Sequence, residues 1–264
     1  MAAVNKNTIV IVHSVGPIIL EPFVELPNVK AIVWAGLSGQ EAGNSLVDVL
    51  YGDVSPSGKL PYTIAKKAAD YGTTIQANTD SFSEGLFIDY RYLDKNNIVP
   101  RYEFGYGLCE SFLSFCSTAS LDLRAKLTRI PVIAYTNFTY TNLTINPSQG
   151  TASGPVPSTS LYDAALVVWA TVSNTGNYSA AEVAQLYITF PSAVPATPIR
   201  QLRGFEKEII RLDETVNLSF TLRKKDLSFW DTAKGQWVIS SGSFGIAVGA
   251  SSRDLRLKGN FDIA

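Results

Sequence analysis

The stretch VKAIVWAGLSGQEAGNSLVDVLYG (Val29–Gly52) decides the fold of the first part of the chain. Its opening run, Val29–Ala35, is apolar and rich in β-branched residues, which is typical of a strand buried on both faces of a parallel sheet. Ser38 precedes Glu41 by three residues, and because this is the spacing of a capping box, a helix is predicted to begin there. Apolar residues then recur at helical spacing, and the final glycine is placed to end the helix.

An upstream apolar run, Ile9–Val12, predicts the neighbouring strand. The intervening Pro17–Leu26 has room for a loop and a short helix, so a βαβ crossover is expected. Downstream, Lys59–Ile64 is predicted to be an edge strand because it contains a proline. The glycine-rich turn Gly36–Gly43 matches no dinucleotide or phosphate-loop motif, so tight packing of strand against helix is preferred to an anion site.

From Ala164 onward, short alternating segments separated by turn residues are typical of an immunoglobulin-like β-sandwich of about seven strands. The expected strands are Ala164–Val172, Ala184–Phe190, Ile209–Leu212, Val216–Leu222, Trp237–Ile239 and Phe244–Val248. The predicted fold class is therefore α/β plus all-β, with part of an α/β sandwich in residues 1–122 and the β-sandwich in 161–264. Residues 123–160 are predicted to be a linker or an extended arm, because Asn146–Ser160 is rich in Pro, Gly, Ser and Thr.

Composition and charge argue against several classes of protein. There are 22 basic and 23 acidic residues, so no basic excess is available to neutralise nucleic-acid phosphates. The longest apolar stretch, Thr8–Leu20, is interrupted and too short for a membrane span, and it does not resemble a signal peptide. His13, Cys109 and Cys116 are too few for a zinc site, and no metal or cofactor is expected. The two cysteines either pair in a secreted protein or remain buried free thiols.

Five stretches carry a family resemblance: TIVIVHSVGP (Thr8–Pro17), NVKAIVWAGLSGQEAGNSLVDVLYGDVSPSGKLPYT (Asn28–Thr63), FSEGLFIDYRYLDKNNIVPRYEFGYGL (Phe82–Leu108), LRGFEK (Leu202–Lys207) and RKKDLSFWDTAKGQWVISSGSFGIAVGASSRDLRL (Arg223–Leu257). They resemble the C-terminal part of fungal β-glucosidases of glycoside hydrolase family 3. The resemblance covers nearly the whole chain and is weakest from about Ser117 to Ser160. Cys109 and Cys116 depart from the family pattern.

The resemblance implies the end of an α/β sandwich domain followed by a fibronectin type III-like domain, in an extracellular enzyme that hydrolyses terminal β-D-glucosyl residues. It also implies that the family's aspartate nucleophile and glutamate acid/base belong to segments that precede these 264 residues, so neither is carried over and the chain alone is expected to be inactive by that mechanism. The open sheet would then be covered by the remaining part of the enzyme, by self-association, or by Ser117–Ser160. The alternatives are a stand-alone carbohydrate-binding or structural module, or a weak glycosidase that uses its own carboxylates on a β-glucoside or oligosaccharide.

Retaining glycoside hydrolysis requires two carboxyl groups only about 5–5.5 Å apart. Glu84 and Asp89 are the best local candidates, but on one strand, five residues apart, they would point to opposite faces. A structural ion pair between Arg91 and a nearby acid is the preferred interpretation, and Glu103 and His13 are also expected to be structural.

Trp169, Trp230 and Trp237 fall in predicted strands or turns, so core packing is preferred to a sugar-stacking role. Four N-glycosylation sequons suit a secreted protein; they begin at Asn137, Asn142, Asn177 and Asn217.

Overall fold

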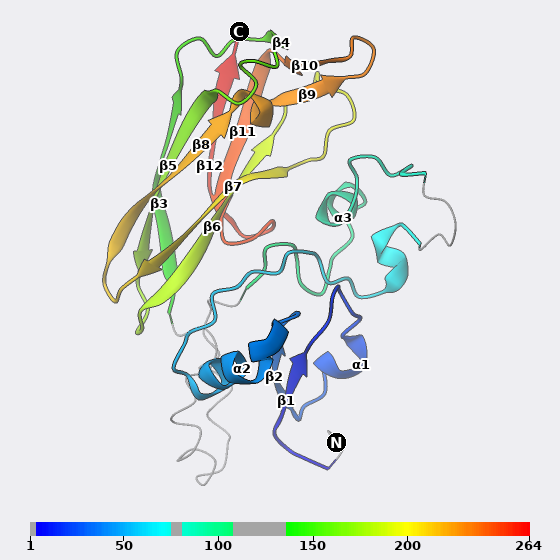
Figure 1. The fold of residues 1–264 in the computed structure, drawn as a ribbon, viewed down its shortest axis with the longest axis vertical. Helices are drawn as coiled ribbons and strands as arrows, with labels where there is room; N and C mark the ends of the chain where they lie inside the picture. The colour runs from blue at the N-terminus through cyan, green and yellow to red at the C-terminus, as the bar shows by residue number, and fades with distance from the viewer. Residues whose placement is uncertain (1–3, 75–80, 108–135) are drawn as a thin grey trace.

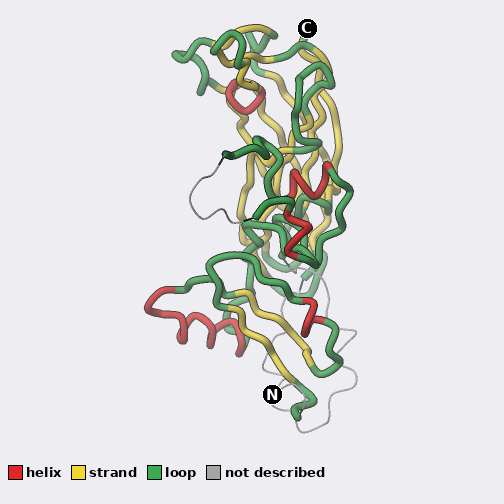
Figure 2. The backbone as a smooth tube through the Cα atoms, turned by 90° about the vertical axis from the view of Figure 1, so that its right-hand side faces the viewer, coloured by secondary structure: helices red, strands yellow, loops and turns green. Residues whose placement is uncertain are grey.

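The computed structural model describes residues 4–74, 81–107 and 136–264, and they form two parts that lie end to end. Figure 1 shows a small α/β part at the N-terminal end and a long β-sandwich beyond it, and Figure 2 shows the same order from the side. Cys109 and Cys116 lie outside the described residues, as does the first part, residues 117–135, of the segment Ser117–Ser160 that is expected to fold over the sheet.

The α/β part is built on two parallel strands, β1 (Thr8–Val12) and β2 (Val29–Trp34). A short helix, α1 (Glu21–Val24), lies between them in sequence, and this confirms the predicted βαβ order. The expectation that the second strand is buried on both faces is wrong, because every residue of β2 is only partly buried among the described residues.

Helix α2 (Ala42–Tyr51) follows a turn of 3-10 helix, η1 (Gly39–Glu41), and ends as predicted at Gly52, whose φ is 89°. The predicted capping box does not form. The hydroxyl of Ser38 donates instead to the carbonyl of Ala35 at 3.1 Å, since the first turn is a 3-10 turn and the α-helix begins only after it. No residue of α2 is buried.

Residues 59–64 do not form the predicted edge strand. They run extended beside residues 101–106, where Ile64 and Tyr102 make a single antiparallel bridge and Leu60 donates to the carbonyl of Tyr106 at 2.7 Å. Pro61 has no amide hydrogen, so a continuous ladder is not possible there. A 3-10 helix, η2 (Ala68–Tyr71), and the short helix α3 (Tyr90–Lys95) complete this part.

The β-sandwich confirms the predicted all-β second part. One sheet has the order β3-β5-β8, the facing sheet has the order β12-β11-β6-β7, and a small sheet has the order β4-β10-β9. Their bounds are β3 (Phe138–Pro147), β4 (Gly154–Val156), β5 (Ala164–Asn174), β6 (Ala180–Thr189), β7 (Gln201–Ile210), β8 (Thr215–Arg223), β9 (Ser228–Asp231), β10 (Gln236–Ile239), β11 (Gly242–Gly249) and β12 (Leu255–Ile263), with a 3-10 turn, η4 (Lys224–Leu227), before β9.

Two strands of the sandwich come from the segment expected to be a linker. β3 pairs along β5 and β4 pairs with β10, so residues 138–147 and 154–156 are integral to the sheets. β7 is also much longer than the predicted Ile209–Leu212, and β12 was not predicted. The reason is that β7 and β12 carry charged residues on their exposed faces, which weakens the apolar signal along the sequence.

The hydrophobic core lies between the two large sheets. It includes Val168 and Val172 of β5, Leu186 of β6 and Phe244 of β11, all with no exposed surface. Phe244 stacks on Phe261 with ring centroids 5.2 Å apart. Full burial of one such side chain stabilises a fold by about 1.5–3 kcal/mol, so the sandwich holds most of the stability of the described chain.

Residues 89–107, which we call the connecting segment, attach the α/β part to the sandwich through buried polar contacts. Asp94 lies 3.0 Å from the guanidinium groups of both Arg200 and Arg253. The side-chain amide of Gln185 donates to the carbonyls of Gly105 and Ala250 at 3.0 and 2.8 Å. Each contact has a defined direction, so together they fix how the two parts meet.

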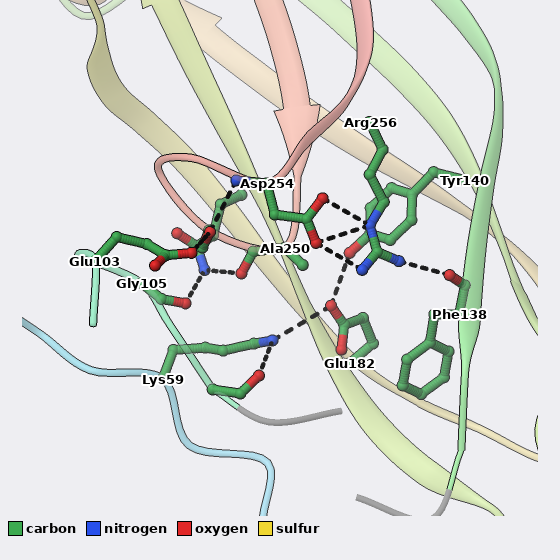
Figure 3. Close-up of polar contacts among 12 residues, drawn as sticks. Lys59, Glu103, Gly105, Phe138, Tyr140, Glu182, Ala250, Asp254 and Arg256 are labelled. Carbon is green, nitrogen blue, oxygen red and sulfur yellow. Dashed lines mark hydrogen bonds and ion pairs between the residues drawn. The ribbon is translucent and has the colours of Figure 1, made fainter. Parts of the chain in front are cut away.

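A second buried network lies beside the connecting segment, as Figure 3 shows. Lys59 of the α/β part lies 3.4 Å from the carboxylate of Glu182 on β6, which also accepts a hydrogen bond from the Tyr140 hydroxyl at 2.8 Å. The guanidinium of Arg256 lies over the Tyr140 ring and donates to the carbonyl of Phe138 at 2.6 Å.

Candidate active site

A cavity of about 470 Å³ lies at the junction of the two parts. Its walls come from the loop after β1 (Pro17), from residues 61–73, from the start of α3, and from Leu202 of β7. The carboxyl ends of parallel strands are where ligands bind in open α/β sheets, and the loop after β1 leaves from such an end. The size and place of the cavity are those of a small-molecule site.

Glu84 and Asp89 both line this cavity. The assumption that they lie on one strand is wrong, because residues 83–86 form a turn and α3 starts directly after Asp89. The two side chains therefore reach one cavity, although strand geometry predicted opposite faces. The structure thus brings together the two carboxylates singled out from the sequence.

The two carboxylates have different surroundings. Asp89 accepts the backbone N–H of Thr63 at 2.8 Å and has a φ of 52°, in the left-handed region, so its carboxylate holds the residues 61–64 segment in place. The Glu84 carboxylate makes no hydrogen bond or ion pair within the described part of the chain. Glu84 is consequently the acidic group that is available to a ligand.

Arg91 also lines the cavity, and the predicted ion pair between Arg91 and an acid is absent from the described residues. Its Nε atom donates to the Tyr90 hydroxyl at 3.3 Å, and its guanidinium lies 5.6 Å from the Tyr90 ring centroid. Tyr90 is itself fixed, because its hydroxyl accepts the backbone N–H of Leu202 at 3.0 Å. The Arg91 charge is therefore held at the cavity without a carboxylate to neutralise it.

Two tyrosines add aromatic surface to the cavity. The Tyr62 hydroxyl accepts a hydrogen bond from the indole nitrogen of Trp34 at 2.7 Å, and the two rings meet edge to face. The Tyr71 hydroxyl donates to the carbonyl of Thr63 and accepts the N–H of Ala65, each at 3.0 Å. Burial raises the pKa of Tyr71 above its usual value, so this phenol stays neutral.

The arrangement offers one free carboxylate, one guanidinium and several aromatic rings around a cavity of sugar size. A carboxylate accepts hydrogen bonds from sugar hydroxyls, a guanidinium donates to them, and aromatic rings pack on the apolar faces of pyranoses. Tyr62 and Tyr71 were not predicted as site residues, since nothing in their sequence context separates them from core tyrosines.

The other sequence candidates lie elsewhere. Glu103 accepts a hydrogen bond from Ser251 at 2.7 Å and so has the expected structural role, whereas His13 is exposed. Trp169 and Trp230 are about half exposed, so core packing was wrong for both, while Trp237 packs against the core and contacts Trp230 edge to face.

Residues 4–74, 81–107 and 136–264 contain neither a metal-binding cluster nor a membrane-spanning helix. No group of three or more His, Cys, Asp or Glu residues could hold a metal ion there. None of the helices in those ranges is long and apolar enough to cross a membrane.

Comparison with known proteins identifies both parts. Residues 1–108 match the glycosyl hydrolase family 3 C-terminal domain, and residues 182–252 match the fibronectin type III-like domain. The chain is 52% identical to the probable beta-glucosidase L of Aspergillus terreus over 270 aligned residues, which cover 100% of this chain and 33% of the relative. It is 51% identical to beta-glucosidase cel3A of Pyricularia oryzae, over 98% of this chain and 33% of the relative.

A solved structure gives the same result. The beta-D-glucoside glucohydrolase of Trichoderma reesei superimposes with a TM-score of 0.87 at 50% identity, covering 100% of this chain and 34% of that protein. The chain therefore spans about a third of the length of the relatives it matches. It consists of a glycoside hydrolase family 3 C-terminal domain region followed by a fibronectin type III-like β-sandwich.

Proposed function

We propose that this chain is part of a β-glucosidase that hydrolyses terminal β-D-glucosyl residues, and that its cavity contributes to the binding of the sugar. The relatives named above are β-glucosidases, and the chain matches about a third of each. The observation that carries the proposal is the cavity in which the unpaired Glu84 carboxylate and the Arg91 guanidinium lie beside Tyr62.

In this role Glu84 accepts hydrogen bonds from sugar hydroxyls and Arg91 donates to them. The ring of Tyr62, held by Trp34, packs on an apolar face of the pyranose. Asp89 keeps residues 61–64 in position through its bond to the Thr63 amide. These residues bind and position the sugar; they do not break the glycosidic bond.

We further propose that the nucleophile and the acid/base lie outside these 264 residues, so that the chain alone has no hydrolytic activity. Two observations support this placement. The Asp89 carboxylate is already engaged by a backbone amide, and Glu84 lies partly exposed on a turn.

The direct test is an assay of the purified 264-residue chain with an aryl β-glucoside. We expect no turnover, together with measurable glucose binding in an NMR titration that Glu84→Gln weakens at least tenfold. Glu206→Gln, an exposed change on β7, is the matched control and leaves binding unchanged. Turnover by the wild-type chain that Glu84→Gln abolishes would favour the weak-glycosidase alternative.

A stand-alone carbohydrate-binding module is the second candidate, because the same cavity could bind a sugar without any catalytic partner. A mixing experiment separates the two. Addition of the preceding two thirds of a family 3 β-glucosidase restores hydrolysis if this chain is part of an enzyme. Sugar binding without complementation would support the module.

We also propose that the exposed apolar side chains of the α/β part contact the rest of such an enzyme. Val15, Leu37, Val47 and Tyr51 are all exposed and lie around β1, β2 and α2. Self-association is the alternative occupant of this surface. Light scattering of the isolated chain, with hydrogen exchange of β1 and β2 in the presence of the complementing fragment, distinguishes the two.

The extracellular location expected from the resemblance remains part of this proposal. It is supported by the four sequons, all of whose asparagines are exposed. Detection of the protein in the culture medium of its producing cells would test it directly.

A further inference from the structure

The outer face of the β3-β5-β8 sheet is almost free of charge. Along all three strands the only charged residue is Arg223, at the very end of β8. The exposed positions are filled largely by hydroxyl and amide side chains, such as Thr141, Asn142 and Asn217. Protein surfaces normally carry interspersed charges for solubility, so an uncharged sheet face of this length needs another source of solubility.

Trp169 lies in the middle of this face and 42% of its surface is exposed. Its direct cross-strand partners are Thr144 on β3 and Ser219 on β8. These two residues are the hydroxyl positions of two sequons, Asn142-Leu143-Thr144 and Asn217-Leu218-Ser219. Directly opposed residues have Cβ atoms about 4.5–5.5 Å apart, so both sequons lie within reach of the indole ring.

The asparagine side chains of the two sequons both form a hydrogen bond with Thr171. The Thr171 hydroxyl donates to Asn217 Oδ1 at 2.8 Å and accepts from Asn142 Nδ2 at 3.5 Å. Leu218 is buried in the core and Leu143 packs against it. The central leucines therefore point inward, and the asparagine and hydroxyl residues on either side point to the solvent.

We propose that Asn142 and Asn217 are N-glycosylated and that the first sugar of each glycan packs against Trp169. The donor would be a lipid-linked oligosaccharyl diphosphate of the secretory pathway. In the transfer, Asn Nδ2 forms a bond to C1 of the sugar, the bond from C1 to the diphosphate oxygen breaks, and the amide proton leaves with the diphosphate. A glycosylated asparagine keeps one N–H, so the contact of Asn142 with Thr171 is retained.

The remaining two sequons lack this arrangement. Asn137 precedes β3 and Asn177 lies in the turn before β6, and neither stands beside Trp169. Figure 1 shows β3, β5 and β8 side by side along the sandwich, with the turns at the ends of the strands. The proposal is therefore specific to two of the four sequons.

The test is secretion of the full 264-residue chain from yeast behind a leader peptide, followed by peptide mass spectrometry after enzymatic deglycosylation in ¹⁸O water. We expect the mass label of a converted asparagine at positions 142 and 217. Thr144→Val and Ser219→Ala each remove one label, whereas the control changes Thr144→Ser and Ser219→Thr keep it. Unmodified asparagines at both positions would overturn the proposal.

Packing on the indole is tested separately by acrylamide quenching of tryptophan fluorescence, with Trp169→Phe used to isolate the Trp169 signal. We expect at least twofold weaker quenching of Trp169 in the glycosylated protein than in the deglycosylated protein or in chain made in bacteria. Equal quenching in all three preparations would show that the glycans point away from the indole and would overturn that part of the proposal.

Discussion

Lys59 and Glu182 form a buried ion pair, and we predict that removing Glu182 lowers the free energy of unfolding by more than removing Lys59 does. Only 9% of the Lys59 side chain and 1% of the Glu182 side chain is exposed, so each charge depends on nearby groups (Figure 3). We compare Lys59→Met, which removes the cation, with Glu182→Gln, which removes the anion and keeps the shape.

The magnitudes follow from what each change leaves behind. After Lys59→Met, Glu182 still accepts from the Tyr140 hydroxyl and still feels the positive charge of Arg256. The free energy of unfolding then falls by the contribution of one long charge-assisted hydrogen bond, about 1.5–2 kcal/mol. After Glu182→Gln, the buried ammonium has only neutral acceptors within the described part of the chain, among them the carbonyl of Gly107 at 3.5 Å, and leaving a buried charge without an anion costs about 3 kcal/mol or more.

The assay is urea denaturation followed by circular dichroism, with the slope checked for a single transition. Lys207→Met and Glu206→Gln, both exposed on β7, serve as matched controls and are expected to change the free energy of unfolding by less than about 0.5 kcal/mol. The reasoning is refuted if Lys59→Met destabilises the protein as much as Glu182→Gln, or if both behave like the controls.

Three further predictions concern the same junction and can be checked by thermal denaturation. Gly105→Ala is expected to lower the free energy of unfolding by more than about 2 kcal/mol, because φ of Gly105 is +76° and the new Cβ would overlap the Gln185 side chain. Gly85→Ala is the control: φ of Gly85 is +56° but the space around it is open, so this change should lower the free energy of unfolding by only about 1 kcal/mol. Asp94→Asn is expected to cost about 3–5 kcal/mol, since it leaves two arginines without their buried anion; a loss below 1 kcal/mol would contradict this. The hydrogen bond from Arg101 lowers the pKa of Glu21 below 4.5, so its stabilising effect is complete above that pH and is lost as the pH falls through the lowered pKa. Glu21→Gln should therefore lower the Tm more at pH 7 than at pH 2, and an equal effect at both pH values would refute this assignment.

Hydrophobic periodicity in the sequence correctly located the strands in which buried and exposed residues alternate along the whole length. β5 and β8 alternate cleanly between core and solvent, and their predicted bounds agree with the structure to within two residues. The linker prediction for residues 123–160 rests on the Pro-, Gly-, Ser- and Thr-rich composition of Asn146–Ser160, and it misses β3, whose outer positions carry threonine and asparagine instead of an apolar pattern. Core packing of Trp169 is expected from the sequence because the residue falls in a predicted strand, whereas the alternation along β5 places its side chain on the outer face.

The candidate site was only partly predictable for a different reason. Glu84 and Asp89 could be selected by residue type, but their approach to one cavity depends on a turn and on a positive φ at Asp89, which the strand-like pattern around them conceals. Tyr62 and Leu202 reach the cavity through long-range contacts that one sequence does not encode locally.

Residues from both the α/β part and the sandwich line the cavity. The hydrogen bond from the backbone N–H of Leu202 to the Tyr90 hydroxyl joins its two sides. One wall belongs to β7 and the others to the α/β part, so the cavity is complete only while the two parts are docked. A ligand that binds there stabilises the docked form by RT ln(1 + [L]/Kd), which is about 2.7 kcal/mol at one hundred times Kd. Sugar would thus act as a non-covalent crosslink, and unfolding that occurs in separate steps without ligand should merge towards one cooperative transition as the ligand concentration rises.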